Sequence, residues 1–239
     1  MTGKNFFDDE RRRFEDAASE ELRVELAAEG ETQVNIYLAS EIEGLIMSPY
    51  TLGLACPSLW ELPQIQSVRE KRGRKGRTAT PINDRVLPQN RFGLAMFRGA
   101  CVHELSHHLD WRRFVSAHVG TTQSIAATTE AITVDPSKWS WNNEPPIWKS
   151  HEYGFIRCAL FLSDRMSQRG VHVNWLSDLI PWGEYGYKDP IGYAETVRQE
   201  ISDSRDKPLG EILKRLAPKE MVKLWAIDAG AQLLQKVEE

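Results

Sequence analysis

The sequence has few cysteines and no closely spaced pair of them. Its three cysteines are Cys56, Cys101 and Cys158, and no C-x-x-C pair occurs in the 239 residues. This excludes a disulfide framework and a cysteine-based zinc ribbon. No apolar run approaches the roughly 18 residues that a transmembrane helix needs, and the first residues lack the apolar stretch of a secretory signal. We therefore expect a soluble cytoplasmic protein with no membrane partner.

The charges are close to balance. The 30 Lys and Arg residues face 34 Asp and Glu residues, a formal net charge of −4, which argues against a protein that coats nucleic acid. One local exception is a basic run over residues 69–77 that is interleaved with glycines. It predicts a solvated loop or, as an alternative, a phosphate-binding loop in which Arg72, Arg74, Lys75 and Arg77 contact nucleic acid or substrate.

The first ninety residues alternate between helical and extended patterns. Apolar residues at a spacing of three to four predict helix, and alternation with β-branched residues predicts strand. Pro57 and Pro63 interrupt any regular pattern over residues 50–68. The predicted elements are a helix over 5–29 that ends at Gly30, a strand over 32–38, a short helix over 40–48 and a strand that enters a turn over 78–88.

The rest of the chain is mainly helical in pattern. Asn90 is a suitable N-cap for a long helix, and Pro218 suits the start of the last one. The predicted helices cover residues 91–113, 149–166, 191–204, 208–216 and 218–237. Between the first two, residues 112–148 lose periodicity and are interpreted as an insertion or lid that includes Trp139 and Trp141.

These patterns predict an α+β fold. We expect a small antiparallel or mixed sheet packed on the helix over 91–113 and on the second helix, over 149–166. The predicted segments are an N-terminal helix over 1–30, a core over 31–170 and a helical C-terminal region over 171–239.

The motif that carries chemistry is H-E-x-x-H, formed by His103, Glu104 and His107. Four residues of helix advance about 400°, so the two imidazoles share a face and lie about 6 Å apart along the axis. They can close on one metal ion. Glu104 lies about 100° around the helix, where it can reach a metal-activated water instead of the metal.

A catalytic zinc ion needs a third protein ligand and an open position. His108 points about 100° away from His107, and Asp110 lies about 10 Å along the helix from His103, so neither closes the site. His151 is the favoured third ligand at the start of the second helix, with Glu152 as the alternative.

Together these residues resemble the SprT-like zinc metallopeptidases. His103, Glu104 and His107 match the family's H-E-x-x-H, while His151 and Phe155 match its H-x-x-x-F. The resemblance covers residues 30–166 and implies a minigluzincin-like core with one zinc ion held by the three histidines. A more distant resemblance is to the ImmA/IrrE-type metallopeptidases, which would favour Glu152 as the third ligand.

The expected function is that of a zinc metalloendopeptidase that hydrolyses protein or peptide substrates, with Glu104 as general base. Tyr153 is a candidate for stabilising the transition state, although packing is the alternative. Asp110 is expected either to orient a ligating histidine or to be an exposed helix charge. A substrate strand is expected to pair with the sheet edge near 78–87.

Two other functions remain open from the sequence. The chain can be a regulatory or binding module on a metallopeptidase-like fold, or a protein that associates with nucleic acid through residues 69–77. Glu104 distinguishes the first of these from an enzyme, because a structural metal site has no need of a general base.

Overall fold

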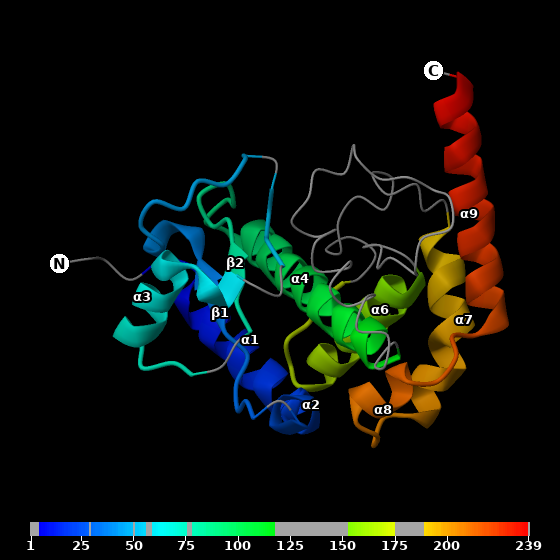
Figure 1. The fold of residues 1–239 in the computed structure, drawn as a ribbon, viewed down its shortest axis with the longest axis horizontal. Coiled ribbons are helices and arrows are strands. Elements are labelled where there is room, and N and C mark those ends of the chain that lie inside the picture. The colour runs from blue at the N-terminus through cyan, green and yellow to red at the C-terminus, as the bar shows by residue number, and fades with distance from the viewer. Residues whose placement is uncertain are drawn as a thin grey trace.

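The computed structural model describes residues 5–28, 30–49, 51–55, 59–75, 78–117, 153–174 and 189–238. Helices dominate this part of the chain, and one long helix, α4 (Arg91–Ala117), runs through the middle of the molecule (Figure 1). The strands and the first three helices lie on one side of α4, and the last three helices lie on the other (Figure 1). No helix within the described ranges has the length and apolarity needed to cross a membrane.

The N-terminal helical pattern forms two helices, α1 (Asp8–Glu21) and α2 (Arg23–Ala28), which confirms the helix predicted over 5–29. Gly30 ends this pair with a positive φ of 71°, a conformation that costs a glycine little. There the Glu31 N–H donates to the Leu26 carbonyl at 2.8 Å, which satisfies one of the open carbonyls at the helix end.

Two short strands, β1 (Ile36–Leu38) and β2 (Thr80–Ile82), pair in parallel with Tyr37 opposite Pro81. On its other side β2 is joined in antiparallel fashion by an isolated bridge between Gly53 and Ile82. The coarse α+β class is therefore confirmed. The parallel direction of the strand pair differs from the antiparallel alternative that we expected.

The prediction for residues 39–71 needs two corrections. The short helix expected over 40–48 is only a 3₁₀ turn, η1 (Ala39–Glu41). Residues 50–68, which seemed interrupted by proline, contain a second 3₁₀ turn, η2 (Leu59–Glu61), and the helix α3 (Pro63–Lys71). Pro63 starts α3 because the first turn of a helix leaves backbone N–H groups unpaired and tolerates a residue without one.

The start of α4 follows the prediction. The Asn90 side chain accepts a hydrogen bond from the Gly93 N–H at 3.0 Å, which caps the helix. A side chain at Gly93 would collide with the Pro88 carbonyl oxygen, so glycine permits the tight entry of the chain into α4.

Beyond α4 the chain forms α6 (Tyr153–Gln168), α7 (Pro190–Asp203), α8 (Leu209–Leu213) and α9 (Lys219–Glu238). These helices confirm four of the predicted ones, although α8 is shorter than expected. Two buried arginines of α6 reach the C-terminal region. Arg157 forms an ion pair with Glu200 and donates to the Arg215 carbonyl at 2.7 Å.

The second of these arginines, Arg165, donates to the backbone carbonyls of Ser204, Arg205 and Lys207, just after α7 ends. Through these three hydrogen bonds α6 holds the turn that follows α7. The hydrophobic core likewise runs from Phe7 to Met221 and draws on all three predicted segments.

Candidate metal centre

His103 and His107 lie on one face of α4, as the spacing of the motif predicted. Their Nε2 atoms are 3.1 Å apart, and their rings are inclined at 81° with centroids 4.8 Å apart. Both residues are buried, with exposed fractions of 5% and 8%. The motif therefore brings two nitrogen donors together at buried positions on α4.

The spacing of these donors fits a zinc ion. Two nitrogens bound at about 2.05 Å with tetrahedral angles would lie about 3.3 Å apart. The same distance also suits a hydrogen bond in which one imidazole donates to the other, an arrangement that depends on the tautomers. The spacing of the two nitrogens is compatible with a metal, which would need a third donor from elsewhere.

The predicted third ligands, His151 and Glu152, lie outside the described residues. Within the described ranges no group of three or more His, Cys, Asp and Glu side chains lies close enough to hold a metal ion. The expected three-histidine set therefore remains a prediction in its third member.

Glu104, the predicted general base, is 7% exposed and lies beside these histidines on α4. Burial raises the pKa of its carboxyl group from the ordinary 4.5 to about 8. Burial favours the neutral form because the surroundings solvate a carboxylate poorly. A carboxyl group with a pKa near neutrality is suited to accept and return a proton.

Gly53 lies against the Glu104 side chain. A Cβ atom built at Gly53 would be 2.5 Å from Glu104 Cγ and 2.8 Å from Oε1, closer than such atoms can approach. Nothing in the sequence pattern marked Gly53, because the contact joins segments about fifty residues apart. Its close approach to the carboxyl group is a feature that sequence reasoning missed.

Backbone hydrogen bonds fix the segment that carries Gly53. Leu54 N–H donates to the Pro81 carbonyl at 3.0 Å, and Asn83 N–H donates to the Leu52 carbonyl at 2.8 Å. The Asn83 side chain also donates to the Thr51 carbonyl at 3.0 Å. Strand β2 thus has partners on both sides, which corrects the expectation that its edge is available to a substrate strand.

Two aromatic residues at the start of α6 have different contacts. The Phe155 ring packs on both histidines, with centroids 4.4 Å from His107 and 4.8 Å from His103. Tyr153 packs edge-on against Trp225 of α9 at 5.6 Å. This contact favours the packing role for Tyr153 over a role in the reaction.

His108 and Asp110 are both buried, with exposed fractions of 8% and 2%. The exposed-charge interpretation of Asp110 is therefore wrong: α4 is covered on that side as well. The alternative role of Asp110, orienting a ligating histidine, stays a prediction.

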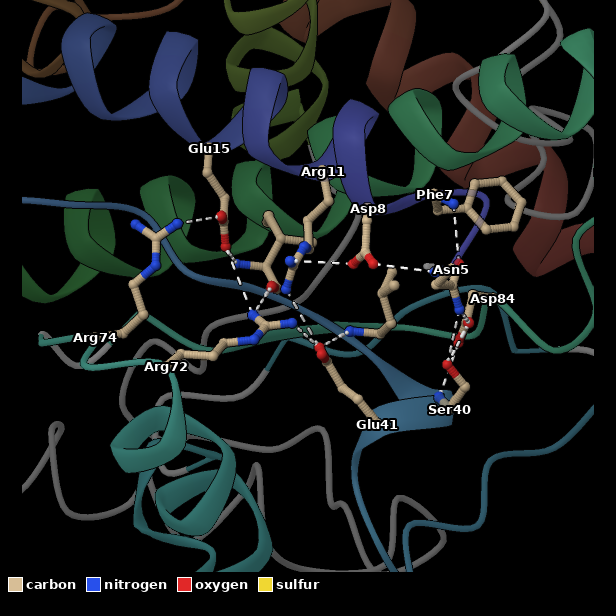
Figure 2. A network of polar contacts seen from close by, with 12 residues as sticks. Asn5, Phe7, Asp8, Arg11, Glu15, Ser40, Glu41, Arg72, Arg74 and Asp84 are labelled. Atoms are coloured by element: carbon tan, nitrogen blue, oxygen red, sulfur yellow. Dashed lines mark hydrogen bonds and ion pairs between the residues drawn. The ribbon is translucent and has the colours of Figure 1, made fainter. Parts of the chain in front are cut away.

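The basic run is not the solvated loop that its composition suggested. Its first residues belong to α3, and Figure 2 shows Arg72 and Arg74 directed toward carboxylates beneath α1. Arg74 pairs with Glu15 at 2.7 Å, and Arg72 pairs with Glu41. Both arginines are thus engaged inside the protein.

The other two cations of the predicted phosphate-binding loop are Lys75 and Arg77. Lys75 is exposed, and its carbonyl accepts a hydrogen bond from Asn35 at 3.0 Å. Arg77 lies outside the described residues, as do Trp139 and Trp141. The nucleic-acid contact stays a prediction, with two of its four cations already in ion pairs.

Compared with protein-family models, with curated proteins and with solved structures, the chain shows no match.

Proposed function

We propose that this protein is a zinc-dependent endopeptidase of the H-E-x-x-H type. In this proposal His103 and His107 hold the metal and Glu104 acts as general base. The observation that carries it is the 3.1 Å approach of the two Nε2 atoms beside a buried carboxyl group. The SprT-like metallopeptidases, which the motifs resemble, are the proposed relatives, with His151 as the third ligand and Glu152 as the alternative.

When bound, zinc would lower the pKa of a water molecule and polarise the substrate carbonyl. The residues of the chain supply the rest. A carboxylate oxygen of Glu104 takes the proton from the attacking water and then returns it to the leaving amine. The burial that raises the pKa of Glu104 to about 8 makes this transfer feasible in both directions.

The substrate is proposed to lie along the segment formed by residues 52–54, because β2 already has partners on both sides. An extended peptide that pairs there would pass beside Gly53 and therefore close to Glu104. Placing the scissile bond next to the general base is the geometric requirement for proton transfer.

The two other functions have less support. A binding module has no use for Glu104, whose burial disfavours the charged form and is not offset by a cation among the described residues. Association with nucleic acid through residues 69–77 would have to use cations other than Arg72 and Arg74, or break their ion pairs.

The first experiment is metal analysis by mass spectrometry of the purified wild-type protein and of His107→Ala and His151→Ala. His172→Ala is the matched control, because His172 is exposed and not part of the motif. We expect one zinc ion per chain in the wild type and the control, and loss of zinc in the other two variants. Zinc retained in His151→Ala would move the third ligand to Glu152 or to another residue.

The second experiment tests the chemistry. Glu104→Gln should keep zinc and the fold but reduce peptide hydrolysis at least about 100-fold, the usual contribution of a general base. Hydrolysis at the wild-type rate would contradict the role of Glu104. A wild-type chain that binds no metal after reconstitution with zinc would remove the proposed function altogether.

A further inference from the structure

The ring of Phe155 packs on the rings of both His103 and His107. It projects from α6, whereas the two histidines that it contacts both belong to α4. Its ring is stacked on His107 at an interplanar angle of 27° and inclined to His103 at 66°. Phe155 is itself 5% exposed, so the three rings form one buried cluster.

The orientation of an imidazole ring is weakly determined by its own bonds. The χ2 torsion of histidine joins an sp³ to an sp² carbon and has a broad energy profile, so neighbouring groups set the plane of the ring. Metal binding needs both nitrogens directed at one point. A third ring packed on both imidazoles restricts both planes at once.

We propose that Phe155 is a positioning residue that holds the His103 and His107 rings in the orientation required to bind the metal. This inference rests on the proposed metal site, and it assigns part of the metal affinity to a residue that contributes no ligand atom. Groups that orient ligands typically change metal affinity by about 10- to 100-fold. Imidazole rings that move freely lose conformational entropy when the metal binds. Packing by Phe155 restricts the two rings beforehand, so less entropy is lost on binding and the affinity is higher.

Phe161 provides a matched control. It is fully buried on the same helix, and its ring centroid lies 5.8 Å from the guanidinium carbon of Arg157. Replacing either phenylalanine with leucine removes a ring from the core at similar cost in packing. Only the Phe155 variant removes the ring that contacts both histidines.

The test measures the zinc dissociation constant by competition with a chromophoric chelator, in the wild type, Phe155→Leu and Phe161→Leu. We expect zinc binding to weaken roughly 10-fold in Phe155→Leu and to be unchanged in Phe161→Leu. The absorption spectrum of the cobalt-loaded protein should also change in Phe155→Leu alone, because it reports the geometry of the ligands. Phe155→Tyr, which keeps the ring, should restore both properties.

The unfolding temperature of the metal-free variants separates the positioning effect from a general loss of packing. If Phe155→Leu does not fold, Phe155→Met takes its place, since the flexible methionine side chain fills irregular space. Wild-type affinity and an unchanged cobalt spectrum in the Phe155 variant would overturn the inference, and so would equal weakening in both variants. Failure of the wild type to bind zinc or cobalt would instead overturn the proposed function itself.

Discussion

Two buried carboxyl groups, those of Glu15 and Glu104, lie in different surroundings. Beneath α1, Glu15 accepts hydrogen bonds from Ile36 N–H at 2.9 Å and from Arg74 at 2.7 Å (Figure 2). In the candidate metal centre, Glu104 lies among histidines and a glycine, and within the described residues no cation pairs with it. Within the part of the chain that the structure describes, Glu15 is paired with a cation and Glu104 is not.

The causes of the pKa shifts differ between Glu15 and Glu104. Burial raises the pKa of both carboxyl groups, but at Glu15 the Ile36 N–H and the Arg74 and Arg11 guanidiniums oppose it. At Glu104 burial acts alone and raises the pKa to about 8. Structural ion-pair networks and functional sites both shift pKa values. Among the described residues, partners that oppose the shift are found for Glu15, whereas Glu104 is the group for which we propose a function.

The largest change in the free energy of unfolding should come from breaking the network around Glu15. Glu15→Ala removes the acceptor of Ile36 N–H and the partner of Arg74, and should lower the free energy of unfolding by about 3–5 kcal/mol. Urea denaturation measures this loss. Glu20→Ala on the same helix removes an exposed pair with Arg169 and should cost less than about 1 kcal/mol. Similar losses in the two variants would show that the buried network is not special.

A smaller change in the free energy of unfolding, of opposite sign, is expected for Glu104. In metal-free protein, Glu104→Gln should raise the free energy of unfolding by about 3 kcal/mol at neutral pH. The folded-state pKa lies above the unfolded value, so the neutral carboxyl group stabilises the fold at low pH. That contribution is lost as the pH rises from 4.5 to about 8.

The advantage of Glu104→Gln should therefore grow over this range of pH, as urea denaturation in the presence of a chelator would show. A loss of stability in the variant, at any pH in that range, would mean that the carboxyl group is compensated after all.

The smallest effect tests the close approach of Gly53. Gly53→Ala places a methyl group against Glu104 and should lower the free energy of unfolding by about 1 kcal/mol, the lower end for overpacking. In a Glu104→Ala background the obstacle is gone, and the same substitution should cost nothing. Urea denaturation of the four proteins gives the coupling directly. Equal costs in both backgrounds would place the strain elsewhere.

Local patterns predicted the helices well because their signals lie within a few residues. Asn90 caps α4 as expected, and Gly30 ends the N-terminal pair. The proline at position 63 was interpreted as an interruption although it begins α3. The same residue type serves both purposes, and only the following residues decide between them.

Pairings between distant segments were not predictable in this way. The partners Arg74 and Glu15 are 59 residues apart, and no local rule links them. The parallel direction of β1 and β2 likewise depends on how the chain crosses between them. For the candidate site, the spacing of the motif predicted the approach of His103 and His107, whereas the contacts of Gly53 and Phe155 needed the fold.

The two buried arginines of α6 have a consequence for engineering. A shortened protein that ends before α7 would lose Glu200 and the backbone carbonyls that Arg157 and Arg165 contact. The acceptors that the described residues offer Arg157 would all be lost, whereas Arg165 would keep its pair with Glu21. A buried guanidinium without compensation costs several kcal/mol. The part of the chain that carries the candidate metal centre therefore cannot be separated at this boundary without a loss of stability, because α6 depends on acceptors from the C-terminal helices.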